Sequence, residues 1–207
     1  MRNPGLVIQP PVLMRKIYPD AVYRIRNDEK KVFLTFDDGP IPEVTPWLTD
    51  LLEAYSVKST FFCVGENVKK YPDVYNLLSN RGHRVGNHTY NHLRGLKTPN
   101  DVFLLNVERA SALIDSDLFR PPHGLMTIGQ YKNLKKKFRI ILWDVLSCDT
   151  RHGIDPEEVL RNVLGHVRSG SVITFHDSLK SSNILKEVLS VMIEKLKEEG
   201  YSFHPIE

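Results

Sequence analysis

The stretch KVFLTFDDGP, residues 31–40, joins an apolar run to two adjacent carboxylates and a Gly-Pro turn. Short runs of apolar and β-branched residues of this kind predict strands. Comparable runs recur at residues 59–64, 83–87, 117–120, 139–147, 171–176 and 201–206, with helical patterns between them. Seven strands that alternate with helices predict an α/β fold with a parallel sheet, either open and doubly wound or a small, incomplete barrel.

The composition is that of one globular domain. The chain has 207 residues, of which 41% are hydrophobic, so its core needs no disulfide support. Residues 1–30 fit no strand and helix unit, and we expect them to form an N-terminal extension packed on a domain of residues 31–207. The net charge of +3 is small and the basic residues are scattered, which argues against a nucleic-acid partner.

Location, assembly and cysteine chemistry stay open at this level. The first 20 residues are broken by prolines and lack a continuous apolar segment. The chain as it stands is therefore typical of a cytoplasmic protein, or of a cell-envelope protein if a leader is missing. No apolar run approaches the roughly 20 residues of a membrane span, so we expect no stable membrane insertion. Cys63 and Cys148 lie in apolar segments, which favours two buried thiols and leaves one disulfide as the alternative.

Two helices carry clear sequence signals. Asp155, Pro156 and Glu158 form an N-cap, a first-turn proline and an acidic first turn, and they predict a helix start. Apolar residues between Leu185 and Leu196 recur at helical spacing, with lysines and glutamates on the other side. Such a stripe predicts a helix that packs one face against the core.

Unusual polar residues follow the predicted strands at one end only. They are Asp37 and Asp38 after the first strand, His88 and His92 after the third, Arg120 to Gly124 after the fourth, Asp149 after the fifth, and His176 with Asp177 after the sixth. In parallel α/β folds these carboxyl ends converge on one face and carry the chemistry. Because adjacent residues of an extended strand point to opposite sides, Asp37 and Asp38 can have different tasks.

The segment HTYNH, residues 88–92, suggests a metal site. On a helical turn, the i, i+4 spacing would place the imidazoles of His88 and His92 on one side. Two histidines and a nearby carboxylate are typical of a catalytic metal that keeps a position open, either zinc or non-haem iron. Spacing alone does not decide whether Asp37 or Asp38 is the ligand. The remaining histidines have no comparable polar residues at a strand end beside them. We interpret them as structural or surface residues: His83, His152, His166 and His204.

Five motifs in order, TFDDGP, HTYNH, RPPHG, WDVLSCD and ITFHD, closely resemble the polysaccharide deacetylases of carbohydrate esterase family 4, the NodB-homology domain. The resemblance spans about residues 31–207. It implies a distorted (β/α)7 barrel of parallel strands with outer helices. It also implies a metal-dependent hydrolase, most often a zinc enzyme although cobalt or another divalent ion would serve, that removes N-acetyl groups from N-acetylglucosamine in peptidoglycan or chitooligosaccharides and releases acetate.

Carried over position by position, the resemblance implies a role for each motif residue. Asp38, His88 and His92 would bind the metal, and Asp37 would be the base that takes a proton from metal-bound water. Arg120 would hold Asp37, and the backbone N–H of His123 would help to bind the oxyanion. His176 would be the general acid, tuned by Asp149. An amide needs this set because its carbonyl is a poor electrophile and its amine leaves only when protonated.

Three residues depart from the pattern of the family. His123 stands where most relatives have Tyr, and only its backbone is expected to take part. Thr150 replaces a Trp that usually lines the groove, and Thr174 replaces a Leu of the acetyl pocket. These last two exchanges put a small hydroxyl in place of a bulky apolar wall, so they change the size and polarity of the acyl site without touching the expected metal ligands.

Three other interpretations stay beside the leading one. The same metal site would serve a hydrolase of cyclic imides or ureides, or of the O-acetyl esters of xylan. A catalytically inert glycan-binding module would be expected to lack some of the motif residues, all of which are present. An iron-dependent oxygenase would share the ligand set but would not need the pairs Asp37–Arg120 and Asp149–His176.

Overall fold

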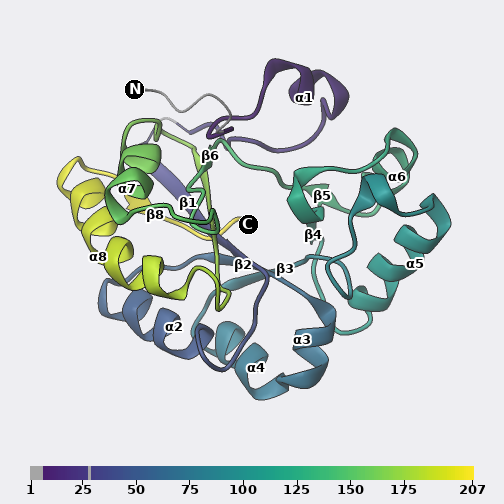
Figure 1. Cartoon of the computed structure of the whole chain (residues 1–207), viewed down its shortest axis with the longest axis horizontal. Coiled ribbons are helices and arrows are strands. Elements are labelled where there is room, and N and C mark those ends of the chain that lie inside the picture. The colour runs from purple at the N-terminus through teal and green to yellow at the C-terminus, as the bar shows by residue number, and fades with distance from the viewer. Residues whose placement is uncertain (1–6, 28) are drawn as a thin grey trace.

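The structure is a computed structural model that describes residues 7–27 and 29–207 (Figure 1). Its centre is a curled, all-parallel sheet in which the strands run in the order β5-β4-β3-β2-β1-β7-β6, and β8 pairs with β1 beside this path. The strands are β1 (Lys31–Asp37), β2 (Thr60–Cys63), β3 (Arg84–Asn87), β4 (Leu118–Phe119), β5 (Arg139–Ile140), β6 (Val145–Leu146), β7 (Val172–His176) and β8 (Ser202–Phe203). Helices surround the sheet, which confirms the predicted distorted barrel.

The quoted stretch forms β1, the strand around which the sheet is built. All residues of β1 after the first are buried, because β2 and β7 flank the strand and helices cover it. A parallel strand that is buried on both faces has no solvent side, which explains why this run is apolar almost without alternation. The stacked rings of Phe36 and Phe61, with centroids 5.0 Å apart, join β1 to β2 in the main core.

The run at residues 139–147 differs from the single strand that the sequence predicts. It forms two short strands, β5 and β6, which lie at opposite edges of the sheet. Residues of the N-terminal segment lie across the seam between these edges: Val22 bridges to Ile141, and Arg24 bridges to Ser171. The chain therefore crosses the seam of the barrel where a regular strand was expected, and the backbone groups there pair with the segment before β1.

The helices are α1 (Val12–Ile17), α2 (Thr45–Ala54), α3 (Gly65–Lys70), α4 (Pro72–Asn80), α5 (Asn100–Ser111), α6 (Ile128–Leu134), α7 (Pro156–Leu164) and α8 (Ser182–Glu198), with 3-10 turns η1 (Gly95–Lys97) and η2 (Pro122–Gly124). The two helix predictions are confirmed. The Asp155 side chain accepts a hydrogen bond from the Glu158 N–H at the start of α7, and the apolar stripe of α8 is buried.

Cysteine and membrane expectations can be compared with the described residues. Cys63 and Cys148 are both free thiols, the first buried and the second half-buried. Within residues 7–27 and 29–207, no helix has the length and apolar character that a membrane crossing needs.

Candidate active site

The register of the parallel strands brings the predicted residues together at one end of the barrel. Asp37, the last residue of β1, is the direct partner of His176, the last residue of β7. Strands β3 and β4 likewise pair at their final residues, so His88 and Arg120, which follow them directly, become neighbours. Residues far apart in the sequence therefore meet because their strands end at the same level of one sheet.

These strand ends line a cavity of about 490 Å³. Its wall contains all but one of the predicted site residues, together with the two threonines that depart from the family pattern: Asp37, Asp38, His88, His92, Arg120, His123, Thr150, Thr174 and His176. Asp149 lies behind His176 and contacts it. The predicted residues thus surround a single space, which is large enough for a sugar residue rather than a whole chain.

Asp37 is fixed by a buried arginine. Arg120 is 1% exposed, and its Nη1 donates to Asp37 Oδ1 at 2.7 Å and to Thr35 Oγ1 at 2.8 Å. Its remaining groups donate to the carbonyls of Ile141 and Leu142, at 3.3 and 3.1 Å. A guanidinium with so many fixed acceptors cannot turn away, so it holds the carboxylate in position and supplies the counter-charge that a buried anion requires.

Asp38 belongs to a turn and not to extended backbone, which corrects the expectation from strand alternation. Its φ of 86° is left-handed. The Asp177 side chain stabilises this turn. It accepts hydrogen bonds from Gly39 N–H and from Thr45 Oγ1, both at 2.9 Å. A Cβ on Gly39 would lie 1.9 Å from an Asp177 oxygen, so only glycine fits there. The two aspartates point apart because the chain turns between them.

Asp38, His88 and His92 form a cluster that fits a metal ion. Their ligand atoms all lie within 4.8 Å of one another, and Asp38 Oδ1 is 3.2 Å from His92 Nε2 and 3.8 Å from His88 Nε2. This oxygen is buried and has no hydrogen-bond partner in the described part of the chain. An orphaned buried carboxylate oxygen that faces two imidazole nitrogens is what a cation would satisfy.

The histidines of the cluster do not lie on a helical turn, so that part of the sequence interpretation is wrong. Residues 88–94 are irregular, and Thr89 and His92 have positive φ values of 65° and 57°. The Nδ1 of His88 lies 2.7 Å from the carbonyl oxygen of Arg120, which can only accept, so Nδ1 carries the proton and Nε2 is free. Burial lowers the pKa of His88 to about 4, which keeps the ring neutral and able to bind a metal.

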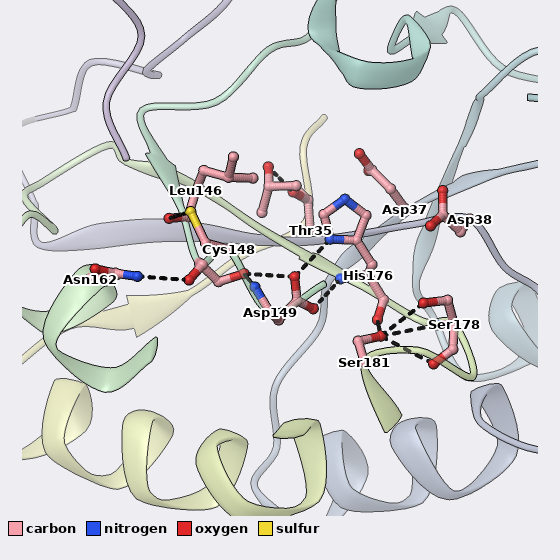
Figure 2. A network of polar contacts seen from close by, with 12 residues as sticks. Thr35, Asp37, Asp38, Leu146, Cys148, Asp149, Asn162, His176, Ser178 and Ser181 are labelled. Carbon is pink, nitrogen blue, oxygen red and sulfur yellow. Dashed lines mark hydrogen bonds and ion pairs between the residues drawn. The ribbon is translucent and has the colours of Figure 1, made fainter. Parts of the chain in front are cut away.

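His176 and Asp149 form the second pair, on the other side of the cavity. The carboxylate of Asp149 contacts His176 Nδ1 at 2.7 Å and accepts from its backbone N–H at 2.8 Å. Figure 2 shows the other ring nitrogen of His176 pointing away from Asp149, on the side where Asp37 lies. Burial lowers the pKa of His176, but the charge and hydrogen bond of Asp149, helped by Asp37 and Asp38, outweigh it and raise the pKa to about 10.

Asp149 itself is held by Ser147, whose hydroxyl donates to Asp149 Oδ1 at 3.0 Å. The carbonyl of Ser147 accepts from the Asn162 side chain on α7, at 3.1 Å. This connection runs from helix to loop to imidazole (Figure 2). These buried groups, and not solvent, therefore fix the position of His176.

His123 lies in the 3-10 turn η2, with a left-handed φ of 59°. The N–H groups of the next two residues, Gly124 and Leu125, donate back to Pro121 and Pro122 and close the turn. The exposed imidazole of His123 accepts from Arg94 Nε at 3.1 Å through Nε2. Because this nitrogen is used by Arg94, the His123 ring is not arranged as a further metal ligand.

The threonines that replace bulky family residues lie in the wall of the cavity. Thr35 Oγ1 donates to the Ile173 carbonyl at 2.8 Å, so the contact of 3.2 Å between the hydroxyls of Thr35 and Thr174 has Thr174 as donor. The Thr174 hydroxyl therefore donates to the Thr35 hydroxyl, which also accepts from Arg120. The cavity thus meets mainly the methyl group of this residue.

Three residues of the site have roles that the sequence does not predict. Asp177, the last residue of the motif ITFHD, supports the turn of Asp38, and burial raises its pKa to about 8. Trp143, the first residue of WDVLSCD, lines the cavity, and its ring lies where a Cβ on Gly124 would be, 2.1 Å away. Arg94 belongs to no motif, and nothing in its local sequence reveals a contact to a turn that lies 29 residues later.

Comparison with known proteins gives consistent results. The polysaccharide deacetylase family model matches residues 24–137. A peptidoglycan-N-acetylglucosamine deacetylase of Bacillus cereus is 31% identical over 93% of this chain and 94% of its own length. A second from the same organism is 34% identical over 85% of this chain, which spans 66% of that relative.

The crystal structure of the Bc1960 peptidoglycan N-acetylglucosamine deacetylase, in complex with an N-hydroxybenzamide, has the same fold. Its TM-score is 0.82 at 31% sequence identity, with 95% of each chain covered. The family model covers more than half of the chain, and the full-length similarity in sequence and structure extends over the motifs described above. The chain therefore belongs to the polysaccharide deacetylase family, carbohydrate esterase family 4, a family of hydrolases that act on carbon–nitrogen bonds.

Proposed function

We propose that this chain is a metal-dependent deacetylase that hydrolyses the N-acetyl group of N-acetylglucosamine in peptidoglycan or chitooligosaccharides. The observation that carries the proposal is the pairing of Asp37 with His176 across β1 and β7, beside the cluster of Asp38, His88 and His92. A base and an acid on one side of a metal cluster are the groups that amide hydrolysis needs, and similarity to the named deacetylases supports the same reaction.

The residues present fit a divalent metal. The orphaned oxygen of Asp38, the free Nε2 of His88 and the Nε2 of His92 are three ligands, which leaves room for water and substrate as in catalytic zinc sites. Imidazole and carboxylate ligands suit Zn²⁺, and Co²⁺ fits the same set. When bound, such a cation would polarise the acetyl carbonyl and lower the pKa of water toward about 7.

Asp37 would act as the base. Its Oδ1 is bonded to Arg120, and Asp37 also lines the cavity, so its other oxygen is the one available to accept a proton from the attacking water. The water oxygen forms a bond to the acetyl carbon as this proton moves to Asp37. The hydrogen bond from Arg120 prevents the carboxylate from rotating, so its orientation toward the water costs no further entropy.

His176 would act as the acid. Its raised pKa keeps it protonated at neutral pH, and with Nδ1 bonded to Asp149 it presents Nε2–H to the cavity. Proton transfer from Nε2 to the amide nitrogen lets the carbon–nitrogen bond break, since an unprotonated amine is a poor leaving group. The products are acetate and a free amino sugar, and the proton on Asp37 can return to His176 through solvent.

The turn that carries His123 would stabilise the oxyanion. Its N–H is not used in the two hydrogen bonds that close η2, which come from Gly124 and Leu125. A fixed backbone donor aimed at the developing negative charge is typically worth about 10²–10³ in rate. The side chain of His123, bonded to Arg94, would take no part in this step.

Acetate release tests the proposal. Chitotetraose, glycan fragments of peptidoglycan and acetylated xylan are incubated with the protein as prepared, after chelation, and after Zn²⁺ or Co²⁺ is added back. We expect release from at least one N-acetylated glycan, its loss on chelation and its recovery with metal. Release that is insensitive to chelation would contradict the metal site. Acetate release from acetylated xylan alone, or ring opening of a cyclic ureide in a parallel assay with no acetate from any glycan, would move the assignment to the other substrate class.

A further inference from the structure

The rim of the catalytic cavity continues into a second hollow. This hollow, of about 280 Å³, is lined by η1 and η2, the turns that follow β3 and β4, and it shares His123 with the catalytic cavity. Its wall is mostly apolar, and it includes Leu96 and Leu125, which are 59% and 42% exposed. The two leucines line one hollow beside the polar catalytic cavity, so they offer a ligand in that cavity an adjoining apolar surface.

The charges at this rim all have one sign. Arg94 and Lys97 line the second hollow and Lys180 lines the catalytic cavity, and all three are exposed. Among the described residues that line the two hollows, the carboxylates are Asp37, which pairs with Arg120, and Asp38, which belongs to the cluster with His88 and His92. Within the described residues, no carboxylate forms an ion pair with Arg94, Lys97 or Lys180, although surface cations elsewhere, such as Lys135 and Lys137, have partners.

Arg94 is also oriented. Its Nε donates to His123 Nε2 at 3.1 Å, which holds the guanidinium, in the wall of the second hollow, beside the residue that the two hollows share. Its terminal nitrogens have no acceptor among the described residues and remain free. A guanidinium that is held by one nitrogen presents a planar pair of donors, which is the geometry that binds a carboxylate through two hydrogen bonds.

We propose that Arg94, with support from Lys97, binds a carboxylate on the sugar next to the N-acetylglucosamine that is deacetylated, while Leu96 and Leu125 contact the apolar part of that sugar's substituent. This inference rests on the proposed function and narrows it to acidic glycans. A muramyl residue has this chemistry: without a peptide it carries a free lactyl carboxylate, and with a peptide it carries the carboxylates of the peptide instead, because the lactyl carboxyl is then bound as an amide. A neutral chitooligosaccharide lacks it.

Steady-state kinetics on three substrates test the inference. They are chitotetraose, an alternating N-acetylglucosamine and N-acetylmuramic acid oligomer without peptides, and the same oligomer with peptides. The variants are Arg94→Gln and Arg94→Lys, with Lys195→Gln on the outer helix α8 as a matched charge control. We expect Arg94→Gln to raise KM about five- to tenfold for acidic glycans and to leave chitotetraose within about twofold. Arg94→Lys should lie between, and the control should not change.

The three substrates distinguish which carboxylate Arg94 binds. An effect only on the oligomer without peptides assigns the carboxylate to the lactyl group, and an effect only on the peptide-bearing oligomer assigns it to the peptide. An effect on both shows that Arg94 binds either carboxylate, and each of these outcomes supports the proposal. Added salt should weaken the preference, as expected for an exposed contact. An equal loss of kcat on all substrates would overturn the proposal, since Arg94 would then act only through His123. No acetate from any of the three would contradict the proposed function itself.

Discussion

Two buried aspartates, Asp37 and Asp144, each contact an arginine, but at opposite ends of strand β7. Asp37 is level with the last residue of β7, whereas the N–H of Asp144 donates to Val172, the first residue. Both oxygens of Asp144 are occupied by donors: Arg15 and Arg168 at Oδ1, and Arg168 and Ser171 at Oδ2. Within the described part of the chain, the Asp37 side chain accepts one hydrogen bond, from Arg120 at Oδ1.

The difference separates a structural carboxylate from the one that we propose as the catalytic base. Asp144 has no side-chain exposure and joins the N-terminal segment and the start of β7 to the seam of the barrel. Its hydrogen-bonding capacity is used up, so it can neither accept a proton from a substrate nor bind a cation. Asp37 is held as firmly on one oxygen, and it keeps the other for the cavity. The number of unoccupied lone pairs, more than burial or pairing, indicates which buried acid performs chemistry.

The largest expected effect comes from Asp37→Asn. The amide keeps the shape and a contact to Arg120 but cannot accept the proton, so we expect acetate release to fall by about 10²–10⁴-fold. Bound zinc should stay close to that of the unchanged protein, and activity is compared per folded molecule because the change also removes the counter-charge of the buried Arg120. The matched change is Asp144→Asn, which should keep full activity per folded molecule; equal losses in the two variants would remove the distinction.

The second effect is on pH dependence, in Asp149→Asn. The acid form of His176 exists below its pKa, and Asp149 is the main group that raises this pKa against the effect of burial. Without that charge the pKa falls, so the alkaline limb of the rate profile should move to lower pH by about one unit or more. The turnover number at neutral pH should fall as well. A limb that stays in place would show that His176 does not supply the proton.

The smallest expected effect on turnover, and a clear one on folding, belongs to Asp144→Asn. The change weakens contacts to Arg168 and Ser171 in a buried position, and the free energy of unfolding should fall by about 1–3 kcal/mol. Burial raises the pKa of Asp144, but its hydrogen bonds from Arg168 and Ser171 lower the pKa by more than burial raises it. The pKa of Asp144 therefore lies below its ordinary value.

The sign of the pH effect follows from this lowered pKa. The ionised form of Asp144 stabilises the native state above the unfolded pKa of about 3.9, and this contribution is lost as pH falls through the folded pKa. Urea unfolding at pH 7 and pH 3 measures it. The free energies of unfolding of the unchanged protein and of Asp144→Asn should differ more at pH 7 than at pH 3. A difference that does not depend on pH would contradict a role for the charge of Asp144.

Much of the site could be predicted because strand ends in a parallel sheet converge by geometry. The motif residues at the ends of β1, β3, β4 and β7 meet for that reason, and a sequence pattern is enough to place them on one face. The same reasoning failed between Arg139 and Ser147. The apolar run there is continuous, so the pattern carries no signal that the chain leaves one sheet edge and joins the other.

Other features depend on contacts between distant residues, which no local pattern contains. The left-handed backbone at Asp38 and His92 is stable only because other segments hold it, as the Asp177 carboxylate holds Gly39. The contact of Arg94 with His123 likewise joins two turns that follow different strands. The sequence therefore predicts which residues lie together at the cavity, whereas hydrogen bonds between distant segments determine the turns that orient their side chains.

We propose that the two adjacent aspartates have different roles, with Asp38 as metal ligand and Asp37 as base. Calorimetric titration of the metal-free proteins with Zn²⁺ compares Asp37→Asn with Asp38→Asn. We expect Asp37→Asn to bind zinc like the unchanged protein, and Asp38→Asn to bind it at least about 100-fold more weakly, because an anionic ligand is lost. Normal zinc binding by Asp38→Asn, with weak binding by Asp37→Asn, would show that these roles are wrongly assigned.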